Sequence, residues 1–171
     1  MTIGLDAASC SRLHAMLDAG LLADTHWIPW CDAQIERLAE IPCWLIEGSM
    51  THEPGVLQAA LMNHIRASVE SNGLGWEDPE RLEVCCYFLR YKRGDWDWRA
   101  LLFELYYMGE DEPPPAGLPS MGDMLRDLDA SAGDMEREQA AEIQARLAPT
   151  LAQVESDYRS ILSAEPGSAV S

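Results

Sequence analysis

Apolar residues recur at intervals of three and four along almost the whole chain, and this spacing constrains the fold more than any other feature of the sequence. It is the spacing of one face of an α-helix, whereas a half-buried β-strand alternates apolar and polar residues. No segment of five or more residues alternates convincingly. The sequence therefore predicts an all-α fold, a single-domain multi-helix bundle whose successive helix pairs could stack as helical repeats do.

Proline, glycine and aspartate divide this pattern into eight expected helical segments. Pro54 and Asp78-Pro79 are start signals, since proline lacks the amide donor that the first turn of a helix leaves unused. Asp95 is expected to cap the next helix. The run from Pro42 to Ile46 is apolar on every side, so we expect it to be buried all round. The expected segments begin near residues 6, 24, 42, 54, 79, 95, 120 and 131.

The C-terminal third is predicted to be a loop followed by two helices. Four prolines between residues 109 and 119 exclude a continuous helix there, which leaves an acidic, proline-rich loop. Residues 120–164 are expected to hold a short helix and then a long one, from Ser131 to about Ser163, which Pro149 kinks. With the preceding helices they complete the predicted domain, residues 1–164, and residues 165–171 are expected to fray.

Acidic residues outnumber basic ones by 29 to 12, and the formal net charge is −17. A field of this sign repels nucleic acids and anionic membranes, so neither is an expected partner and a basic protein is favoured. No stretch is long and apolar enough to span a bilayer, and the first residues lack the basic segment of a signal peptide. We therefore expect a cytoplasmic protein.

The motifs of common catalytic sites are missing or incomplete. Glu47-Gly48-Ser49-Met50 carries only a fragment of the nucleophile elbow, and it follows a helical segment rather than a strand. His64 falls on the apolar face of its helix, where a histidine bonded within the core is the more frequent case. Cys31 and Cys43 could bind a metal together with His26, but free cysteine is more often a small buried hydrophobe. The sequence thus predicts no catalytic residue, no cofactor and no metal.

Two neighbouring residues are candidates for partner binding. If Trp98 faces the core, Trp96 lies about 200° away around the helix and points elsewhere. An outward tryptophan beside the Asp97 carboxylate is typical of an interface anchor, because the aromatic ring gives affinity and the charge sets the register on a basic partner. In the alternative interpretation, Trp96 packs under the acidic loop and Asp97 caps a helix.

Glu110, Asp111 and Glu112 are the other candidate partner-binding residues. They follow the end of a predicted helix, where negative charge is unfavourable against the helix dipole. This local cost favours a role in binding, although a solvated turn that keeps the protein soluble is the alternative. The proline triplet that follows would hold this run away from the body of the protein.

Two segments, from Trp27 to Asp32 and from Glu40 to Ser49, resemble small bacterial cytosolic proteins associated with interbacterial competition. In size, acidity and helicity the whole chain resembles the immunity proteins that protect a cell from polymorphic toxins. The resemblance implies a stoichiometric inhibitor, expressed in the cytosol, that binds one cognate toxin domain and either occludes its active site or locks its shape. Our first hypothesis is therefore a binding protein without catalysis of its own.

Two other functions remain open at this stage. A helical scaffold or adaptor could dimerise, or bind a partner, through the apolar seam of the long helix from Ser131 to Ser163. A metal-dependent enzyme that uses scattered histidine, cysteine and aspartate residues is the third alternative.

Overall fold

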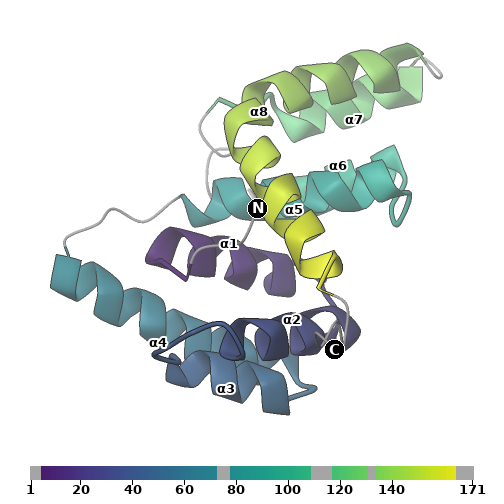
Figure 1. Ribbon diagram of the computed structural model, residues 1–171. Helices are drawn as coiled ribbons and strands as arrows, with labels where there is room; N and C mark the ends of the chain where they lie inside the picture. The colour runs from purple at the N-terminus through teal and green to yellow at the C-terminus, as the bar shows by residue number, and fades with distance from the viewer. Residues whose placement is uncertain (1–4, 73–77, 109–116, 131–133, 165–171) are drawn as a thin grey trace. The chain divides into compact units, whose positions relative to one another are not determined.

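The computed structural model describes residues 5–72, 78–108, 117–130 and 134–164, and all regular structure in these ranges is α-helical (Figure 1). The all-α, multi-helix fold class is confirmed. The helices are α1 (Ala7–Asp18), α2 (Asp24–Ile35), α3 (Cys43–Met50), α4 (Pro54–Asn72), α5 (Pro79–Arg93), α6 (Trp98–Met108), α7 (Met121–Ala130) and α8 (Asp134–Leu162). The frayed tail predicted for residues 165–171 and most of the predicted loop lie outside the described residues.

The chain divides into two compact units. One holds residues 1–79 together with residues 154–171, and the other holds residues 80–153. Helix α8 therefore begins in the second unit and ends in the first. The single domain over residues 1–164 stays a prediction.

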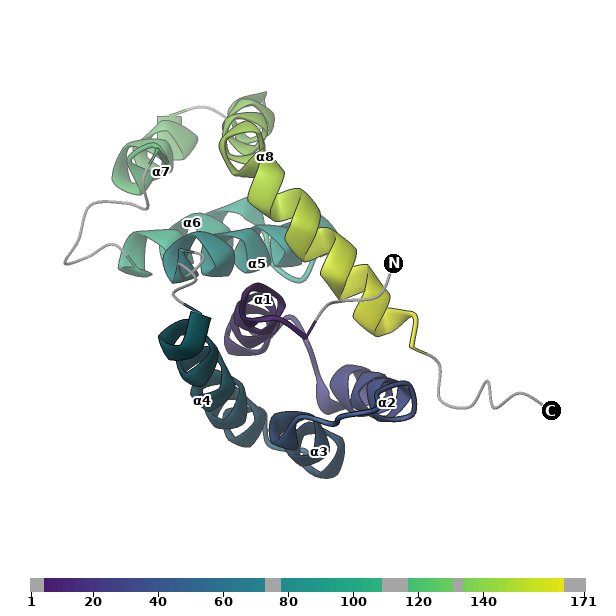
Figure 2. The ribbon, with the colours of Figure 1, turned by 60° about the vertical axis from the view of Figure 1, so that its left-hand side comes forward.

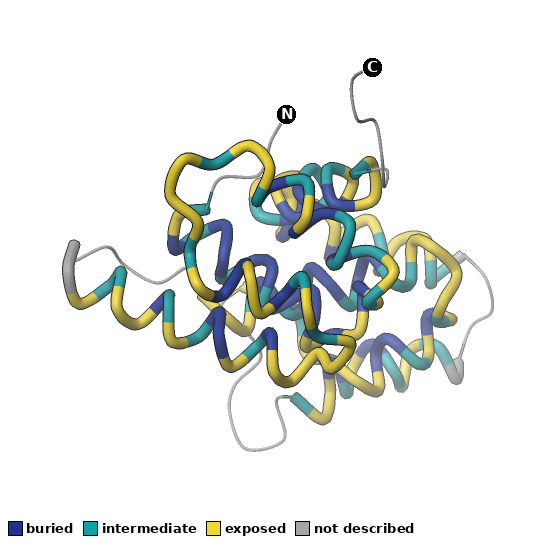
Figure 3. The backbone as a smooth tube through the Cα atoms, turned by 60° about the horizontal axis from the view of Figure 1, so that its bottom comes forward, coloured by how far each residue is buried: buried dark blue, intermediate teal, exposed yellow. Residues whose placement is uncertain are grey.

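In the first unit, α4 contacts both α1 and α3, and α3 contacts α2 in turn (Figure 2). Buried and exposed residues alternate in short intervals along much of the chain, as the burial colours show (Figure 3), whereas α1 is buried or half-buried over all of its length except Asp18. The large side chains of this unit that are almost fully buried include Leu13, Met16, Trp27, Trp30, Leu45, Leu57, Leu61 and Ile65. With Ala60, which is also buried, those on α4 follow the predicted intervals of three and four, so the periodicity that predicted this helix is confirmed.

Helix α3 differs from its prediction in length and in burial. It runs from Cys43 to Met50 rather than ending at Ile46. Trp44 and Leu45 are buried, but Ile46 is 43% exposed and Met50 is 78% exposed. The expectation of burial all round was wrong, because α2 and α4 cover only one side of this helix and leave the other to solvent.

Gly48 explains how α3 approaches its neighbours so closely. A Cβ atom at this position would lie 2.9 Å from the Cys31 sulfur and 3.0 Å from a Leu57 methyl group. Both of these side chains are fully buried and cannot move aside cheaply. The glycine that resembled part of a nucleophile elbow is therefore a packing residue between α2, α3 and α4.

We expect Gly48→Ala to destabilise the protein and Gly55→Ala to be neutral or stabilising. An extra methyl group in a packed core costs roughly 1–3 kcal/mol, which at its lower end equals and over the rest of its range exceeds the roughly 1 kcal/mol that alanine gains over glycine within a helix. Gly55 is a matched control, since the nearest atom to its added Cβ would be a Gln58 oxygen at 4.0 Å. Urea unfolding followed by circular dichroism measures both changes. Equal shifts in the same direction would contradict the packing role of Gly48.

A buried ion pair holds the C-terminal part of α8 against α1 in the first unit. The Arg12 Nε atom donates to Asp157 Oδ2 at 2.6 Å, and the two side chains are only 9% and 7% exposed. Arg12 also donates through Nη2 to the Ser9 hydroxyl at 3.0 Å. The last part of the chain thus completes the first unit by a polar contact as well as by burial of Val154, Tyr158 and Ile161.

In the second unit, a buried glutamine joins three helices. Gln139 of α8 accepts a hydrogen bond from the Trp98 indole of α6 at 2.9 Å. Its amide nitrogen donates to the Met124 carbonyl of α7 at 3.1 Å. Gln139 is 6% exposed, so both of these bonds form out of contact with bulk water. This pair of bonds fixes the N-terminal part of α8 on α6 and α7.

Pro149 lies inside α8, where the sequence predicted a kink. Proline provides no amide hydrogen, so the helix lacks one backbone hydrogen bond at this position. Arg81 of α5 contacts the same region: its Nε atom donates to Thr150 Oγ1 at 3.1 Å, and its Nη2 atom donates to the Arg146 carbonyl. The side chain of Arg81 therefore supports the helix where its own bonding is weakest.

Candidate functional site

The turn between α5 and α6 places the first two predicted binding residues. Helix α5 ends at Arg93, and Gly94 adopts φ 80°, a conformation that favours glycine. Asp97 Oδ1 then accepts the Ala100 amide at 2.8 Å, so Asp97 caps α6. The expectation that Asp95 caps this helix was wrong, because the Gly94 turn delays the start of α6 to Trp98. The Asp95 Oδ2 atom instead lies 3.7 Å from Arg93 Nε and forms an ion pair with it.

Trp96 is half-buried against α5. Its ring centroid lies 5.1 Å from that of Tyr87, and the Arg90 guanidinium carbon stands over the indole at 4.1 Å. A cation held over an aromatic face is attracted by the ring's electron density. These contacts give Trp96 a packing role, and its role in partner binding, like that of Asp97, stays a prediction.

The predicted acidic binding residues Glu110, Asp111 and Glu112 lie outside the described residues. Their place in the sequence is nonetheless informative, since α6 ends at Met108 and the acidic run begins two residues later. Whatever surface α6 offers near its C-terminal end is thus close along the chain to three carboxylates.

Helix α6 offers an exposed aromatic face, defined here as Phe103, Tyr106 and Tyr107. These side chains are 41%, 43% and 61% exposed. The Phe103 and Tyr107 rings stack with centroids 6.5 Å apart, and the Tyr106 and Tyr107 rings meet edge to face at 5.7 Å. The three rings therefore form one cluster on the surface. Clustered large apolar side chains on a surface are a mark of interaction sites.

The spacing of the buried residues on α6 explains why this face is exposed. Trp98, Leu101, Leu102 and Leu105 are all buried. At 100° per residue, Phe103 and Tyr107 fall about 140° and 180° away from Trp98 around the helix. The inward residues were correctly predicted from the sequence, and the same wheel indicates the outward aromatic face, which the sequence reasoning missed.

Carboxylates lie on the elements next to the aromatic face. Glu104 is exposed on α6 itself. Helix α7 contacts α6, and a Cβ atom added to Gly122 would lie 3.6 Å from the Tyr106 ring. The next residue of α7, Asp123, is exposed and pairs with Arg126. The surroundings of the aromatic face thus have the acidic character of the whole chain.

The three residues considered for metal binding, His26, Cys31 and Cys43, do not have the surroundings of metal ligands. His26 accepts the Ala23 amide through Nδ1 at 3.0 Å, Cys43 is exposed, and burial raises the pKa of the Cys31 thiol to about 12. A thiol with so high a pKa stays protonated at neutral pH, and metals bind the thiolate. Among the described residues, no three histidine, cysteine or carboxylate side chains gather as a metal site requires.

His64 is half-buried and contacts a backbone carbonyl and an aromatic ring. Its Nε2 atom lies 3.4 Å from the Leu5 carbonyl oxygen. The imidazole also packs beside the Trp44 ring, with centroids 6.1 Å apart. Of the two bonding partners expected for His64, a backbone carbonyl or a carboxylate, the structure shows the carbonyl, although the residue is half-buried rather than in the core.

The comparisons give no relative for this chain: no family model, curated protein or solved structure matches it. Within the ranges that the structure describes, no helix is both long enough and apolar enough to cross a bilayer.

Proposed function

We propose that the protein binds a cationic partner protein through the aromatic face of α6, and that it acts as an immunity protein that neutralises a bacterial toxin domain by occlusion. The observation that carries the proposal is the exposed cluster of Phe103, Tyr106 and Tyr107. Tyrosine and other aromatic residues are enriched at the centres of protein interfaces, where a few of them supply most of the affinity.

The charge of the chain supports a cationic partner. With a net charge of −17, the protein attracts a basic surface over several ångströms and accelerates the encounter. Toxins that act on nucleic acids need basic clefts to hold phosphates. In this proposal, the carboxylates of Glu110, Asp111 and Glu112 take the place of those phosphates while the aromatic face provides the affinity.

The alternative of a scaffold that binds through α8 has less support. The seam residues in its N-terminal part, Ile143, Leu147 and Leu151, are buried, and so are Val154 and Tyr158 further along. A partner could reach these side chains only if α8 left its place in the fold. The aromatic face of α6 needs no such rearrangement.

The experiment is to identify the partner and then to test the surface. The tagged protein is purified from the cells that produce it, and a captured toxin domain is expressed with and without it to measure protection of growth. We expect Phe103→Ala and Tyr107→Ala each to weaken binding of that domain by about 30-fold or more, which corresponds to roughly 2 kcal/mol. We also expect its association rate to fall steeply as salt is added.

Leu162→Ala is the matched control, since Leu162 is exposed to a similar degree, 44%, but lies on another helix. The proposal is overturned if no cationic protein is captured, if the captured protein does not harm growth, or if both aromatic variants bind like the control. An association rate that is insensitive to salt would remove the electrostatic part of the proposal.

A further inference from the structure

We infer that the outer face of α3 is a second docking surface, and that it receives an amphipathic helix whose apolar side is flanked by lysine or arginine. This α3 face consists of Cys43, Ile46, Glu47 and Met50. It belongs to the first unit, whereas the aromatic face of α6 belongs to the second, so the inference goes beyond the proposed function and does not rest on it.

The α3 face has the spacing of a helix-packing surface. Its four residues stand at intervals of three, one and three along the chain, so they form one ridge on the helix. Ile46 is 43% exposed and Met50 is 78% exposed, and Ile41 just before the helix is 40% exposed. A ridge of this kind fits between the ridges of a second helix. The flexible side chain of Met50 can adapt to the partner's shape.

The opposite side of α3 holds this ridge in place. Trp44 is buried and stacks on Trp30 of α2 with ring centroids 6.3 Å apart. Gly48 brings the helix backbone close to Cys31 and Leu57. Because α3 is fixed by these contacts before any partner arrives, docking on its outer face requires little ordering of the backbone.

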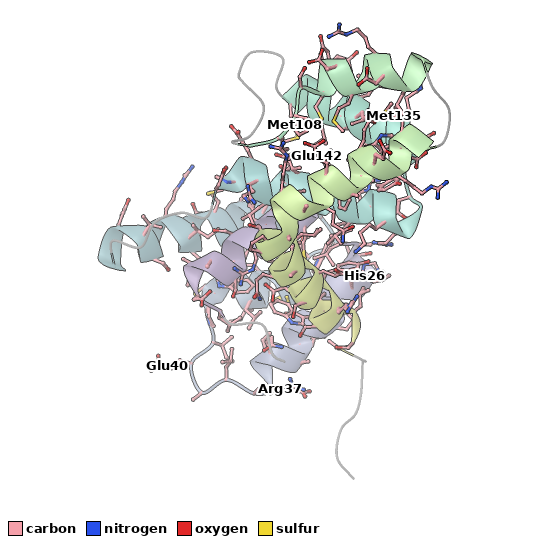
Figure 4. All side chains as sticks on the ribbon, turned by 90° about the horizontal axis from the view of Figure 1, so that it is seen from above. His26, Arg37, Glu40, Met108, Met135 and Glu142 are labelled. Carbon is pink, nitrogen blue, oxygen red and sulfur yellow. The ribbon has the colours of Figure 1, made fainter. Side chains whose placement is uncertain are left out.

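The charges of α3 and of the neighbouring sequence favour a cationic partner. Between Asp32 and Glu53, the chain carries five carboxylates and one arginine, Arg37. All five carboxylates are exposed, and Arg37 and Glu40 come from the segment that joins α2 to α3 (Figure 4). A second copy of this chain would bring the same negative charges to the contact and be repelled. A helix with an apolar stripe and basic flanks can pack its stripe on the ridge and pair its lysine or arginine side chains with the carboxylates.

The test uses two synthetic peptides of about five helical turns, made only of leucine, alanine and lysine. In the striped peptide the leucines share one face, and in the scrambled peptide the same residues are distributed around the helix. We expect the protein to bind the striped peptide at least about tenfold more tightly at physiological salt. Calorimetric titration measures both affinities.

The decisive variant is Ile46→Asp with Met50→Asp, which removes apolar contact while it adds negative charge. We expect it to lose at least about tenfold in affinity for the striped peptide, although its attraction for lysine is greater. The control, Phe103→Asp with Tyr107→Asp, makes the same change of charge on α6 and should bind like the wild type. Met50→Asp alone, at a highly exposed position, provides a milder variant, and a photoreactive group in the leucine stripe should crosslink to residues 41–50.

Equal binding of the two peptides would overturn the inference, and so would unchanged binding by the double variant or crosslinks confined to other segments. If only the Phe103 and Tyr107 variant lost affinity, the peptide would be using the aromatic face of α6, and the α3 face would be rejected. Loss of the toxin partner by the α6 variants, with peptide binding intact, would instead leave the two surfaces independent.

Discussion

Replacement of Asp157 by alanine is expected to destabilise the protein by about 3–5 kcal/mol, because it removes the carboxylate to which the buried Arg12 guanidinium is hydrogen-bonded. Both residues are less than a tenth exposed, so water cannot replace the lost carboxylate at low cost. Chemical unfolding followed by tryptophan fluorescence measures the change, since Trp27, Trp30 and Trp44 all belong to the same unit as this ion pair.

The double replacement Arg12→Met with Asp157→Leu is the informative control. Apolar side chains of similar size remove both charges at once, so we expect the double variant to be much more stable than Asp157→Ala and close to the wild type. A double variant as unstable as the single one would mean that the ion pair itself, rather than the orphaned charge, provides the stability. A cost below about 1 kcal/mol for Asp157→Ala would show that Arg12 finds solvent without its partner.

Replacement of Gln139 by leucine is expected to produce the second large loss. It removes the acceptor of the Trp98 indole, and a buried donor left unpaired costs about 1–3 kcal/mol. It also removes the hydrogen bond from Gln139 to the Met124 carbonyl. Gln144→Leu is the matched control, because Gln144 lies on the same helix but is exposed, and it should change stability by no more than about 0.5 kcal/mol. The same unfolding measurement separates the two variants, and equal stabilities would refute the bridging role of Gln139.

The helical architecture could be predicted because each helix has an apolar side that repeats locally. Leu57, Leu61 and Ile65 on α4 illustrate this, since the burial of all three was visible in their spacing. Pro54 likewise marked the start of that helix. Such signals need no knowledge of distant parts of the chain.

Features that depend on contacts between distant segments could not be predicted. The partners Arg12 and Asp157 are 145 residues apart in the sequence. Each is a charged residue, and a charged residue on a predicted helix is expected to be exposed. The sequence placed Gly48 after a helical segment, whereas it lies inside α3 in close contact with α2 and α4. The geometry of the turn at Gly94, between α5 and α6, decides that Asp97 rather than Asp95 caps α6.

The candidate surfaces show the same division. The exposure of Phe103 and Tyr107 on α6 follows from the helical wheel once Trp98 and the leucines are placed inside. The local pattern of the sequence was therefore sufficient to predict this face. The half-buried state of Trp96 depends on the positions of Tyr87 and Arg90, and the apolar pattern gave no sign of it.

The passage of α8 from one unit to the other determines the order in which the chain can mature during synthesis. Residues 80–153 are contiguous and can collapse on their own once they have emerged from the ribosome. The residues that precede them include Arg12, whose partner Asp157 is translated after all of residues 80–153. The buried ion pair of the first unit can therefore form only after the second unit has been translated.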